Sequence, residues 1–268
     1  MEKQILITGA GGGIGRSIAE ELWNRGYRII ATDIQEELST LQKVKVKTVK
    51  MDVTRVSQIQ DLSNKMKQAG DKIHGIVYSA GVFDMFPFVE CDDSRLHNIL
   101  NVNALGLQRV IQIFLPLLAP SSKIVVISSE SVDLLSPFGL YAYSKYCLEG
   151  LCNVIRQELK LLGHDLIIIR PGAHQTSLFE DSKNPVNGSE NSIFKKYLDL
   201  IPELTNELAP DPSDPKDIAV KVRQIFETAD PANIYKVNID KKLRWFGKLP
   251  DRWKEKLFRK MLNKKLKE

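Results

Sequence analysis

The sequence predicts a single α/β domain in which helices cover both faces of a doubly wound, seven-stranded parallel sheet. Short apolar segments alternate with amphipathic helical segments from residue 3 to residue 170, the order that right-handed βαβ units produce. The 268 residues are 43% hydrophobic, which suits one sizeable core. The first apolar segment also runs directly into a glycine-rich turn and a helix. The expected strands are 4–8, 28–32, 45–50, 75–79, 123–128, 166–170 and 235–237.

The turn after the first strand has the composition of a phosphate-binding loop. It reads Thr8-Gly9-Ala10-Gly11-Gly12-Gly13-Ile14-Gly15, and apolar residues at helical spacing follow until Gly26. Glycines let the backbone approach a pyrophosphate, which the free N–H groups and the dipole of a helix N-terminus attract. A flexible linker is the alternative, but its place between a strand and a helix argues against it. We therefore expect a Rossmann-type dinucleotide site at Thr8, Gly9, Gly13, Ile14 and Gly15.

The second strand ends at Asp33, eighteen residues after Gly15, where a dinucleotide fold reads the adenosine ribose. A carboxylate there accepts from ribose hydroxyls and repels a 2′-phosphate. Ile34 and Gln35 follow it and bring no cation that would neutralise a further phosphate. The expected cofactor is therefore NAD rather than NADP, although Arg16 at the start of the helix could turn toward a phosphate.

A proton-transfer pair lies in Tyr141-Ala142-Tyr143-Ser144-Lys145. On a helix, Tyr141 and Lys145 share one face. An ammonium about 4 Å from a phenol is worth ~4 kcal/mol at an effective dielectric near 20, which would lower the pKa of the phenol from about 10 toward neutrality. A group with such a pKa suits general acid–base catalysis. The spacing recurs by chance in many helices, so the glycine turn is what gives it weight.

These motifs, in this order, resemble the short-chain dehydrogenase/reductase family from residue 3 to residue 240. The turn fits the family pattern T-G-x-x-x-G-x-G, although Gly12 also fits the epimerase branch. The resemblance implies that Asn103 holds a relay water through its backbone, that Ser129 binds the substrate oxygen, and that Lys145 lowers the pKa of Tyr141 and binds the nicotinamide ribose. The remaining cofactor contacts that it implies are Asp52 and Val53 at the adenine, Ser79, Ala80 and Gly81 after the fourth strand, and Pro171, Gly172 and Thr176 at the nicotinamide.

Two departures from the family pattern bear on the site. Ser79 stands where the family usually has asparagine, so we expect altered stability more than lost activity. The gap from Ser129 to Tyr141 is twelve residues, which looks like the retinol and hydroxysteroid dehydrogenase branch. Ser128 would restore the commoner gap of thirteen but should point to the opposite side of its strand. Ser131 is too near the tyrosine along the chain.

The resemblance implies an NAD(H)-dependent oxidoreductase in which Tyr141 is the general acid and base for a hydrophobic secondary alcohol or ketone. The alternative is a catalytically silent dinucleotide-binding regulator, which would be expected to lack Tyr141 or Lys145. An epimerase of the extended branch normally brings more C-terminal chain. The family also implies a homodimer or homotetramer built through helices that begin near Asn103 and Tyr141. Fold alone does not identify a substrate.

The segment 177–215 is expected to form a substrate lid with a helix at 192–208. Apolar side chains should line the pocket beneath it, which favours a hydrophobic substrate. The expected lid residues are Leu178, Phe179, Phe194, Tyr197 and Leu198, and those opposite are Phe83, Phe86, Phe88, Leu134, Leu135 and Phe138. An ordinary core is the alternative role for each.

Several classes of site find no support in the sequence. Three cysteines without paired spacing indicate a reduced, cytoplasmic setting, and four scattered histidines predict no metal site. His174 lies in the nicotinamide loop and could touch substrate, but we expect it to face solvent. The N-terminus shows no secretory signal, and no apolar run is long enough to span a membrane.

The last stretch, 241–268, forms a basic amphipathic extension to the 1–240 domain. It holds twelve Lys or Arg against three acids, a local charge of +9 in a chain whose net charge is +5. Its apolar residues should share one helical face: Trp253, Leu257, Phe258, Met261, Leu262 and Leu266. Such a helix suits peripheral contact with an anionic membrane, and equally a partner subunit or its own domain. No recognised nucleic-acid module accompanies the charge.

Overall fold

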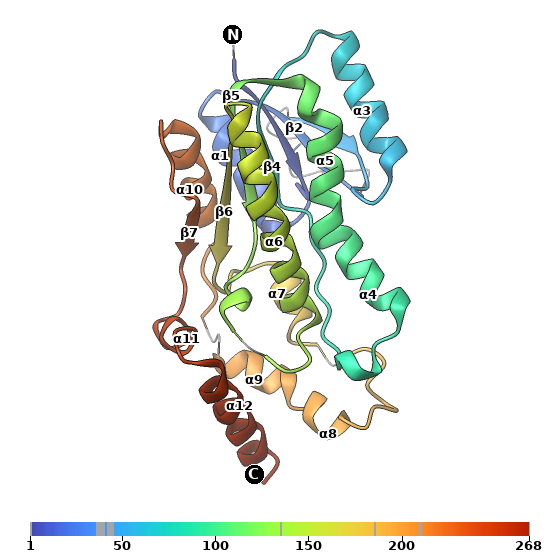
Figure 1. The fold of residues 1–268 in the computed structure, drawn as a ribbon, viewed down its shortest axis with the longest axis vertical. Coiled ribbons are helices and arrows are strands. Elements are labelled where there is room, and N and C mark those ends of the chain that lie inside the picture. The colour runs from blue at the N-terminus through green and yellow to red at the C-terminus, as the bar shows by residue number, and fades with distance from the viewer. Residues whose placement is uncertain are drawn as a thin grey trace.

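The protein folds around one twisted parallel sheet (Figure 1). The structure, a computed structural model, describes residues 2–35, 41, 46–134, 136–184, 186–208 and 211–267. In these ranges seven strands pair in the order β3-β2-β1-β4-β5-β6-β7. They are β1 Gln4–Thr8, β2 Arg28–Asp33, β3 Lys47–Lys50, β4 Ile73–Tyr78, β5 Leu118–Ile127, β6 Asp165–Pro171 and β7 Ile234–Val237. The predicted fold class is confirmed, and every expected strand is present: β1 has the expected bounds, and the other strands are shifted at one or both ends. Lys45 lies outside the described residues.

Helices cover both faces of the sheet because successive strand residues point to opposite sides. Ile5 and Ile7 of β1 join the core beneath α1 (Gly13–Asn24) and α10 (Lys216–Glu227), which pack against each other. Leu6 joins the opposite core. That second core lies beneath α3 (Val56–Gln68), α5 (Gly106–Phe114) and α6 (Leu140–Leu161). The sheet is therefore buried on both sides, as a doubly wound fold requires.

The strand order places the functional end of the sheet. β1 lies between β2 and β4, so the chain reverses its direction of winding there, and ligands of open α/β sheets bind beyond the carboxyl ends of the strands at such a point. In Figure 1 these ends point toward the lower half of the molecule, where the C-terminal helices gather.

A π-helical turn joins two helices on the α6 side of the sheet. Asp92 caps α4 (Asp93–Leu100) by accepting a hydrogen bond from the Arg95 amide at 2.8 Å. The π turn η2 (Asn101–Leu105) follows and leads into α5. Such turns often mark functional sites because they re-aim single side chains. The remaining short helical turns are η1 Phe88–Glu90, η3 Leu115–Leu117 and η4 Glu130–Asp133.

The expected lid contains short helices rather than one long helix. α7 (Ser177–Asp181), α8 (Lys195–Leu198) and α9 (Ile201–Leu208) cross the carboxyl end of the sheet. The prediction of a single helix over 192–208 is wrong. Pro202 lacks an amide hydrogen and restricts the residue before it, so a helix cannot continue unbroken through this point.

The C-terminal extension forms α11 (Lys241–Phe246) and α12 (Asp251–Lys265). Asp240 caps α11 by accepting from the amides of Lys242 and Leu243. Figure 1 shows both helices beyond the carboxyl end of β7, beside α9. The extension therefore lies at the same end of the sheet as the predicted site.

Candidate active site

A cavity of about 430 Å³ opens at the carboxyl ends of the strands. Residues from the glycine turn, the strand ends, α6, the lid and α11 line it. Thirteen of the predicted site residues meet there: Gly9, Gly13, Ile14, Gly15, Asp33, Ser79, Gly81, Ser129, Tyr141, Lys145, Pro171, Gly172 and Thr176. Thr8, Asp52, Val53, Ala80 and Asn103 do not line it among the described residues.

The glycine turn fits a dinucleotide by its backbone. Gly9 has φ +66°, and a Cβ on it would lie 2.6 Å from the Ala80 nitrogen. A Cβ on Gly15 would lie 2.2 Å from the Gly9 carbonyl oxygen, so neither position accepts a side chain. No described side chain caps α1 at Gly12, which leaves the first amides of this helix available to an anion. Thr8 is buried behind the turn, where its hydroxyl accepts from the Ala80 amide at 3.4 Å.

Asp33 lines the cavity beside the glycine turn. One of its carboxylate oxygens accepts from the Gly11 amide at 2.8 Å and the other from the Gln35 amide at 3.1 Å. These bonds hold the carboxylate against the glycine turn, the position that suits recognition of a ribose. Asp52 instead accepts from the amide and hydroxyl of Thr54, and Val53 is buried in the core. The predicted adenine contacts of Asp52 and Val53 thus lie outside the cavity lining.

Tyr141, Ser129 and Lys145 converge in the centre of the cavity. Ser129 follows β5, and its hydroxyl is hydrogen-bonded to the Tyr141 side chain. The Lys145 ammonium lies 5.6 Å from the centroid of the Tyr141 ring and donates to the Ile127 carbonyl at 3.0 Å. Phe83 packs against the Tyr141 ring, with 5.2 Å between centroids. Residues from β5 and α6 therefore meet as the sequence pattern predicts.

The pKa of Tyr141 departs from the sequence prediction. Burial raises the pKa of Tyr141 to about 12, with the nearby Glu130 carboxylate adding to the rise and the hydrogen bond with Ser129 opposing it. Burial also lowers the pKa of Lys145 to about 8. The expectation that Lys145 alone brings the pKa of Tyr141 near neutrality is therefore wrong for this structure, because the cost of burying a phenolate outweighs the attraction of a partly desolvated ammonium. Tyr141 is a protonated hydrogen-bond donor at neutral pH.

Asn103 lies outside the cavity lining and joins two segments that line it. It is fully buried, and its amide oxygen accepts from the Val82 amide at 2.8 Å. Its amide nitrogen donates to the Val82 carbonyl at 2.9 Å and to the Ser144 hydroxyl at 2.8 Å. Asn103 thereby links the segment after β4 to the helix that carries Tyr141 and Lys145.

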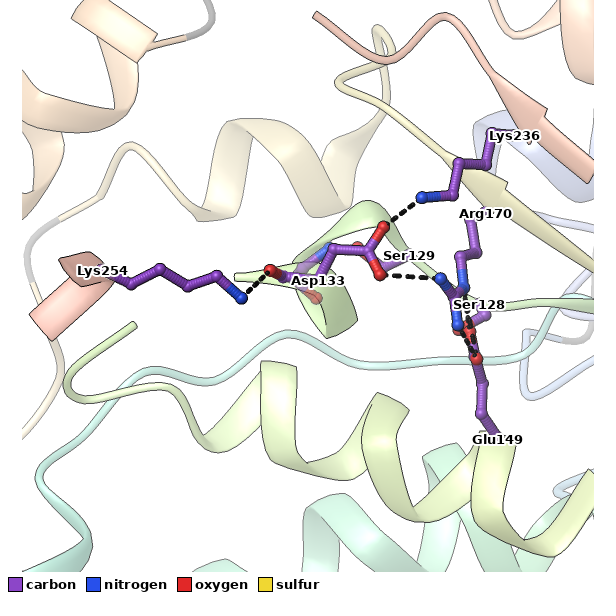
Figure 2. Close-up of polar contacts among 8 residues, drawn as sticks. Ser128, Ser129, Asp133, Glu149, Arg170, Lys236 and Lys254 are labelled. Carbon is purple, nitrogen blue, oxygen red and sulfur yellow. Dashed lines mark hydrogen bonds and ion pairs between the residues drawn. The ribbon is translucent and has the colours of Figure 1, made fainter. Parts of the chain in front are cut away.

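The two serines at the end of β5 have different partners. The Ser128 hydroxyl donates to Glu149 at 2.6 Å, whereas Ser129 contacts Tyr141. Glu149 belongs to a network of charged side chains with Arg170 and Asp133 (Figure 2). The Ser129 hydroxyl also accepts from the Ser131 amide at 3.1 Å. Ser129 is thus the serine whose hydroxyl lies beside Tyr141.

Sequence reasoning missed Glu130 and Leu243, which also line the cavity. Burial, with repulsion from Asp240 and Asp133, raises the pKa of Glu130 to about 7. One Glu130 carboxylate oxygen is buried without a hydrogen-bond partner in the described residues. Its position directly after Ser129 was a signal that could have found it. Leu243 could not be found, because nothing in the sequence brings α11 to the cavity.

His174 does not face solvent, contrary to the expectation. It is 3% exposed, and one ring nitrogen lies 2.8 Å from the Gly172 carbonyl. That carbonyl must accept, so the nitrogen beside it carries the hydrogen and the other ring nitrogen is an acceptor. Burial lowers the pKa of His174.

The apolar walls of the cavity agree in part with the expected pocket. Leu178 and Phe179 of α7 line it, as do Phe83 and Leu134. Phe138 and Phe194 instead stack on each other, with 5.5 Å between centroids, and line a second groove with Tyr197 beneath α12. The other expected members lie elsewhere: Phe86 and Leu198 are buried, Phe88 is exposed, and Leu135 falls outside the described residues.

The helix α12 does not bury its whole apolar face. Trp253 is 59% exposed, and Leu257 and Leu266 are each 37% exposed. Phe258 packs edge-on against Phe246 of α11, while Lys254 is buried. The inward side of α12 thus carries a buried lysine beside the apolar residues, and part of the predicted apolar face stays exposed.

The described residues contain no cluster of three or more His, Cys, Asp or Glu side chains arranged to hold a metal ion. No helix among them combines the length and apolar character needed to cross a membrane.

Known proteins are similar to this chain in sequence. The short chain dehydrogenase family model matches residues 3–187. The 17-beta-hydroxysteroid dehydrogenase type 6 of Rattus norvegicus is 32% identical over 185 residues, covering 66% of this chain but only 58% of that protein. The short-chain dehydrogenase PC-15 of Penicillium crustosum is 35% identical over 205 residues, 74% of this chain and 76% of that one. The NADPH-dependent 1-acyldihydroxyacetone phosphate reductase of Schizosaccharomyces pombe is 28% identical and covers 76% of this chain and 72% of its own.

Solved structures share the fold. A short-chain dehydrogenase from Streptomyces avermitilis superposes with a TM-score of 0.75 at 24% identity, covering 91% of this chain and 90% of that one. A short chain dehydrogenase/reductase from Burkholderia phymatum, solved in complex with NAD, has a TM-score of 0.70 at 20% identity, with 87% and 88% covered. Together with the family match, the fold and the cavity lead to one conclusion: this chain belongs to the short chain dehydrogenase family, whose named members are oxidoreductases.

Proposed function

We propose that the protein is an NAD(H)-dependent oxidoreductase that interconverts a hydrophobic secondary alcohol and its ketone. The observation that carries this proposal is the meeting of Tyr141, Ser129 and Lys145 in one cavity with the glycine turn. A regulator without chemistry would have no need for this arrangement.

Ser129, Tyr141 and Lys145 have different roles in the proton transfer. In ketone reduction Ser129 donates to the carbonyl oxygen, and the protonated Tyr141 phenol delivers the proton that completes the alcohol. In alcohol oxidation Tyr141 first releases its own proton, and the Lys145 ammonium beside the ring stabilises the phenolate, which then takes the proton of the substrate hydroxyl. Bound NAD would supply the hydride acceptor, so the products are the ketone, NADH and one proton. We propose that the backbone at Asn103 holds a water that passes this proton to solvent.

The cavity residues fit a dinucleotide. The uncapped start of α1 would bind the pyrophosphate, Asp33 the adenosine ribose, and Lys145 the nicotinamide ribose. The Burkholderia phymatum neighbour binds NAD, whereas the Schizosaccharomyces pombe relative is NADPH-dependent. Asp33 favours NAD here because its charge repels a 2′-phosphate.

The apolar lining supports a hydrophobic substrate. Leu178, Phe179, Phe83, Leu134 and Leu243 surround the position in front of Tyr141. A similar relative is named for hydroxysteroids, which are secondary alcohols with large apolar bodies. Closure of the lid over such a substrate would exclude water from the reacting carbon.

The outer face of α6 supports a homodimer or homotetramer. Tyr143, Tyr146 and Val154 are 43%, 61% and 57% exposed, and they lie along one side of this helix. A second copy of the chain packing α6 against α6 would cover them. Light scattering should report an oligomer, and Tyr146→Glu together with Val154→Glu should convert it to a monomer.

The exposed face of α12 supports peripheral contact between an otherwise cytoplasmic protein and an anionic membrane. Trp253 and Leu257 are exposed one turn apart, and Lys256 lies on the same side of the helix. Tryptophan and leucine flanked by lysines match the interfacial region of an anionic bilayer. The wild-type protein should sediment with phosphatidylserine vesicles, whereas the Trp253→Ser/Leu257→Ser double variant should stay in the supernatant. Equal recovery of both would end this proposal.

A cofactor-dependent screen tests the proposed activity. Steroid, retinoid, aliphatic and sugar alcohols are offered with NAD or NADP, and the reduced cofactor is followed by absorbance. We expect turnover of a hydrophobic secondary alcohol with NAD. Tight NAD binding without turnover of any compound, in either direction, would instead establish the regulatory alternative.

A further inference from the structure

The segment that carries Ser129 is too short to hold its own conformation. η4 spans only Glu130–Asp133, with Ser129 as its N-cap and Leu134 as its C-cap, and the Leu134 amide donates to the Ser131 carbonyl at 3.1 Å. Forming one helical turn fixes several dihedral angles for one hydrogen bond, so isolated turns are unstable. The position of the Ser129 hydroxyl therefore depends on contacts from outside η4.

Asp133, the last residue of η4, receives most of these contacts (Figure 2). Its carboxylate accepts from Arg170 at 2.8 Å and from Lys236. Arg170 also binds Glu149 through two nitrogens, at 2.9 and 2.6 Å, which joins η4 to α6. These bonds hold the side chain of Asp133 but leave the backbone end of η4 to another partner.

That partner is Lys254 on α12. Its ammonium donates to the Asp133 backbone carbonyl at 3.2 Å and lies 3.4 Å from Asp251. Lys254 is only 8% exposed although it stands in a helix rich in exposed lysines. A buried ammonium is costly unless acceptors surround it, so this contact fixes the position of α12 against η4. In Figure 2 the Lys254 side chain approaches Asp133 from the side opposite Arg170 and Lys236.

We infer that Lys254 is a positioning residue that holds the Ser129 segment in its catalytic conformation, so that the C-terminal helix completes the active site. The inference rests on the proposed function. Lys254 does not touch the reacting atoms. It acts through the Asp133 carbonyl, η4 and the Ser129 hydroxyl, a path along one short turn.

Loss of Lys254 should have two effects at the site. The Ser129 hydroxyl would sample positions away from the substrate oxygen, and such small displacements reduce turnover because catalysis depends on orientation. The hydrogen bond from Ser129 also lowers the pKa of Tyr141, so weakening it should raise the pKa of Tyr141 further. NAD binding should not change, because the glycine turn expected to bind the pyrophosphate follows β1 and lies outside the path from Lys254 through η4 to Ser129.

The test compares Lys254→Met with Lys260→Met, which removes the same charge from an exposed position of the same helix. We expect Lys254→Met to lower kcat by about tenfold or more, to shift the ascending limb of the pH profile of kcat/KM for alcohol oxidation to higher pH, and to leave the Kd for NAD unchanged. Lys260→Met should match the wild type. Lys254→Arg, which keeps a cationic donor, should recover most of the rate.

Amide hydrogen exchange tests the same contact without an activity measurement. The Ser131 and Leu134 amides, which are bonded within η4, should exchange faster in Lys254→Met than in Lys260→Met. Phe258→Ala, which loosens α12 through its contact with Phe246, should share this change and serves if Lys254→Met does not fold. Unchanged exchange in η4, or a kcat equal to that of the wild type, would overturn the inference. A wild type without activity on any substrate would refute the proposed function, and the exchange comparison would still decide the role of Lys254.

Discussion

Replacing Asn103 by alanine should destabilise the protein and disturb both halves of the site at once. Asn103 is fully buried and makes three hydrogen bonds, two to the backbone of Val82 and one to the Ser144 hydroxyl. Val82 lies one residue beyond Gly81, which lines the cavity, and Ser144 precedes Lys145. The variant therefore loosens the cofactor loop and the catalytic helix together.

The size of the effect follows from these contacts. A hydrogen bond contributes about 1 kcal/mol net, and a buried group left without a partner costs about 1–3 kcal/mol. Val82 is 37% exposed, so water can form hydrogen bonds with some of the Val82 backbone groups that the variant leaves without a partner. The expected loss is therefore near the low end, about 3 kcal/mol. For a domain of this size that corresponds to a fall in Tm of about 6–12 °C.

Urea and thermal unfolding of Asn103→Ala against Asn98→Ala provide the measurement. Asn98 is exposed in the preceding helix, so its replacement removes the same amide without a buried contact. Asn98→Ala should stay within about 0.5 kcal/mol of the wild type. A loss below about 1 kcal/mol for Asn103→Ala would show that these three bonds do not hold the site together.

Three further outcomes follow from the charges of the site. In the cofactor-free protein, tyrosinate absorbance compared with that of Tyr141→Phe should show no titration of Tyr141 below about pH 10, because burial raises its pKa to about 12; a titration near pH 7 would refute this. Burial raises the pKa of Glu130 to about 7, so the folded state holds this proton more tightly than the unfolded state, and the stability that this provides is lost as pH rises through 7. Glu130→Gln should therefore raise Tm at pH 8 but not at pH 4; an equal gain at both would contradict the assignment. Asp33→Asn keeps an acceptor for the Gly11 amide and removes the charge, so the ratio of kcat/KM for NADP to that for NAD should rise by about tenfold or more; an unchanged ratio would remove Asp33 from cofactor selection.

Much of the fold could be predicted because its signals are local. Apolar runs such as Ile5-Leu6-Ile7 and the glycine turn behind them specify a strand, a tight turn and a helix within one short stretch. The pair Tyr141 and Lys145 lies on one helix, so its spacing alone places both side chains on one face. The strand ends then bring Asp33 and Ser129 to the same edge of the sheet.

The remainder depends on contacts between distant parts of the chain. Lys254 and Asp133 are 121 residues apart, and no local pattern distinguishes Lys254 from the exposed lysines around it. The pKa of Tyr141 was predicted with the wrong sign because the spacing reveals its cation but not its burial. The helix predicted over 192–208 is two shorter helices, because Pro202 interrupts the backbone hydrogen bonds that one continuous helix would need. Burial is a property of the assembled fold, and the charges it perturbs follow only once the fold is known.

Turnover by Tyr141→Phe tests the central claim most directly. The substitution removes one oxygen and keeps the ring that packs against Phe83. Measured with the best alcohol from the substrate screen, and with the Kd for NAD determined on the same preparation, the variant should bind NAD as the wild type does and show no turnover. Retention of more than about a few per cent of the wild-type rate would mean that another group moves the proton.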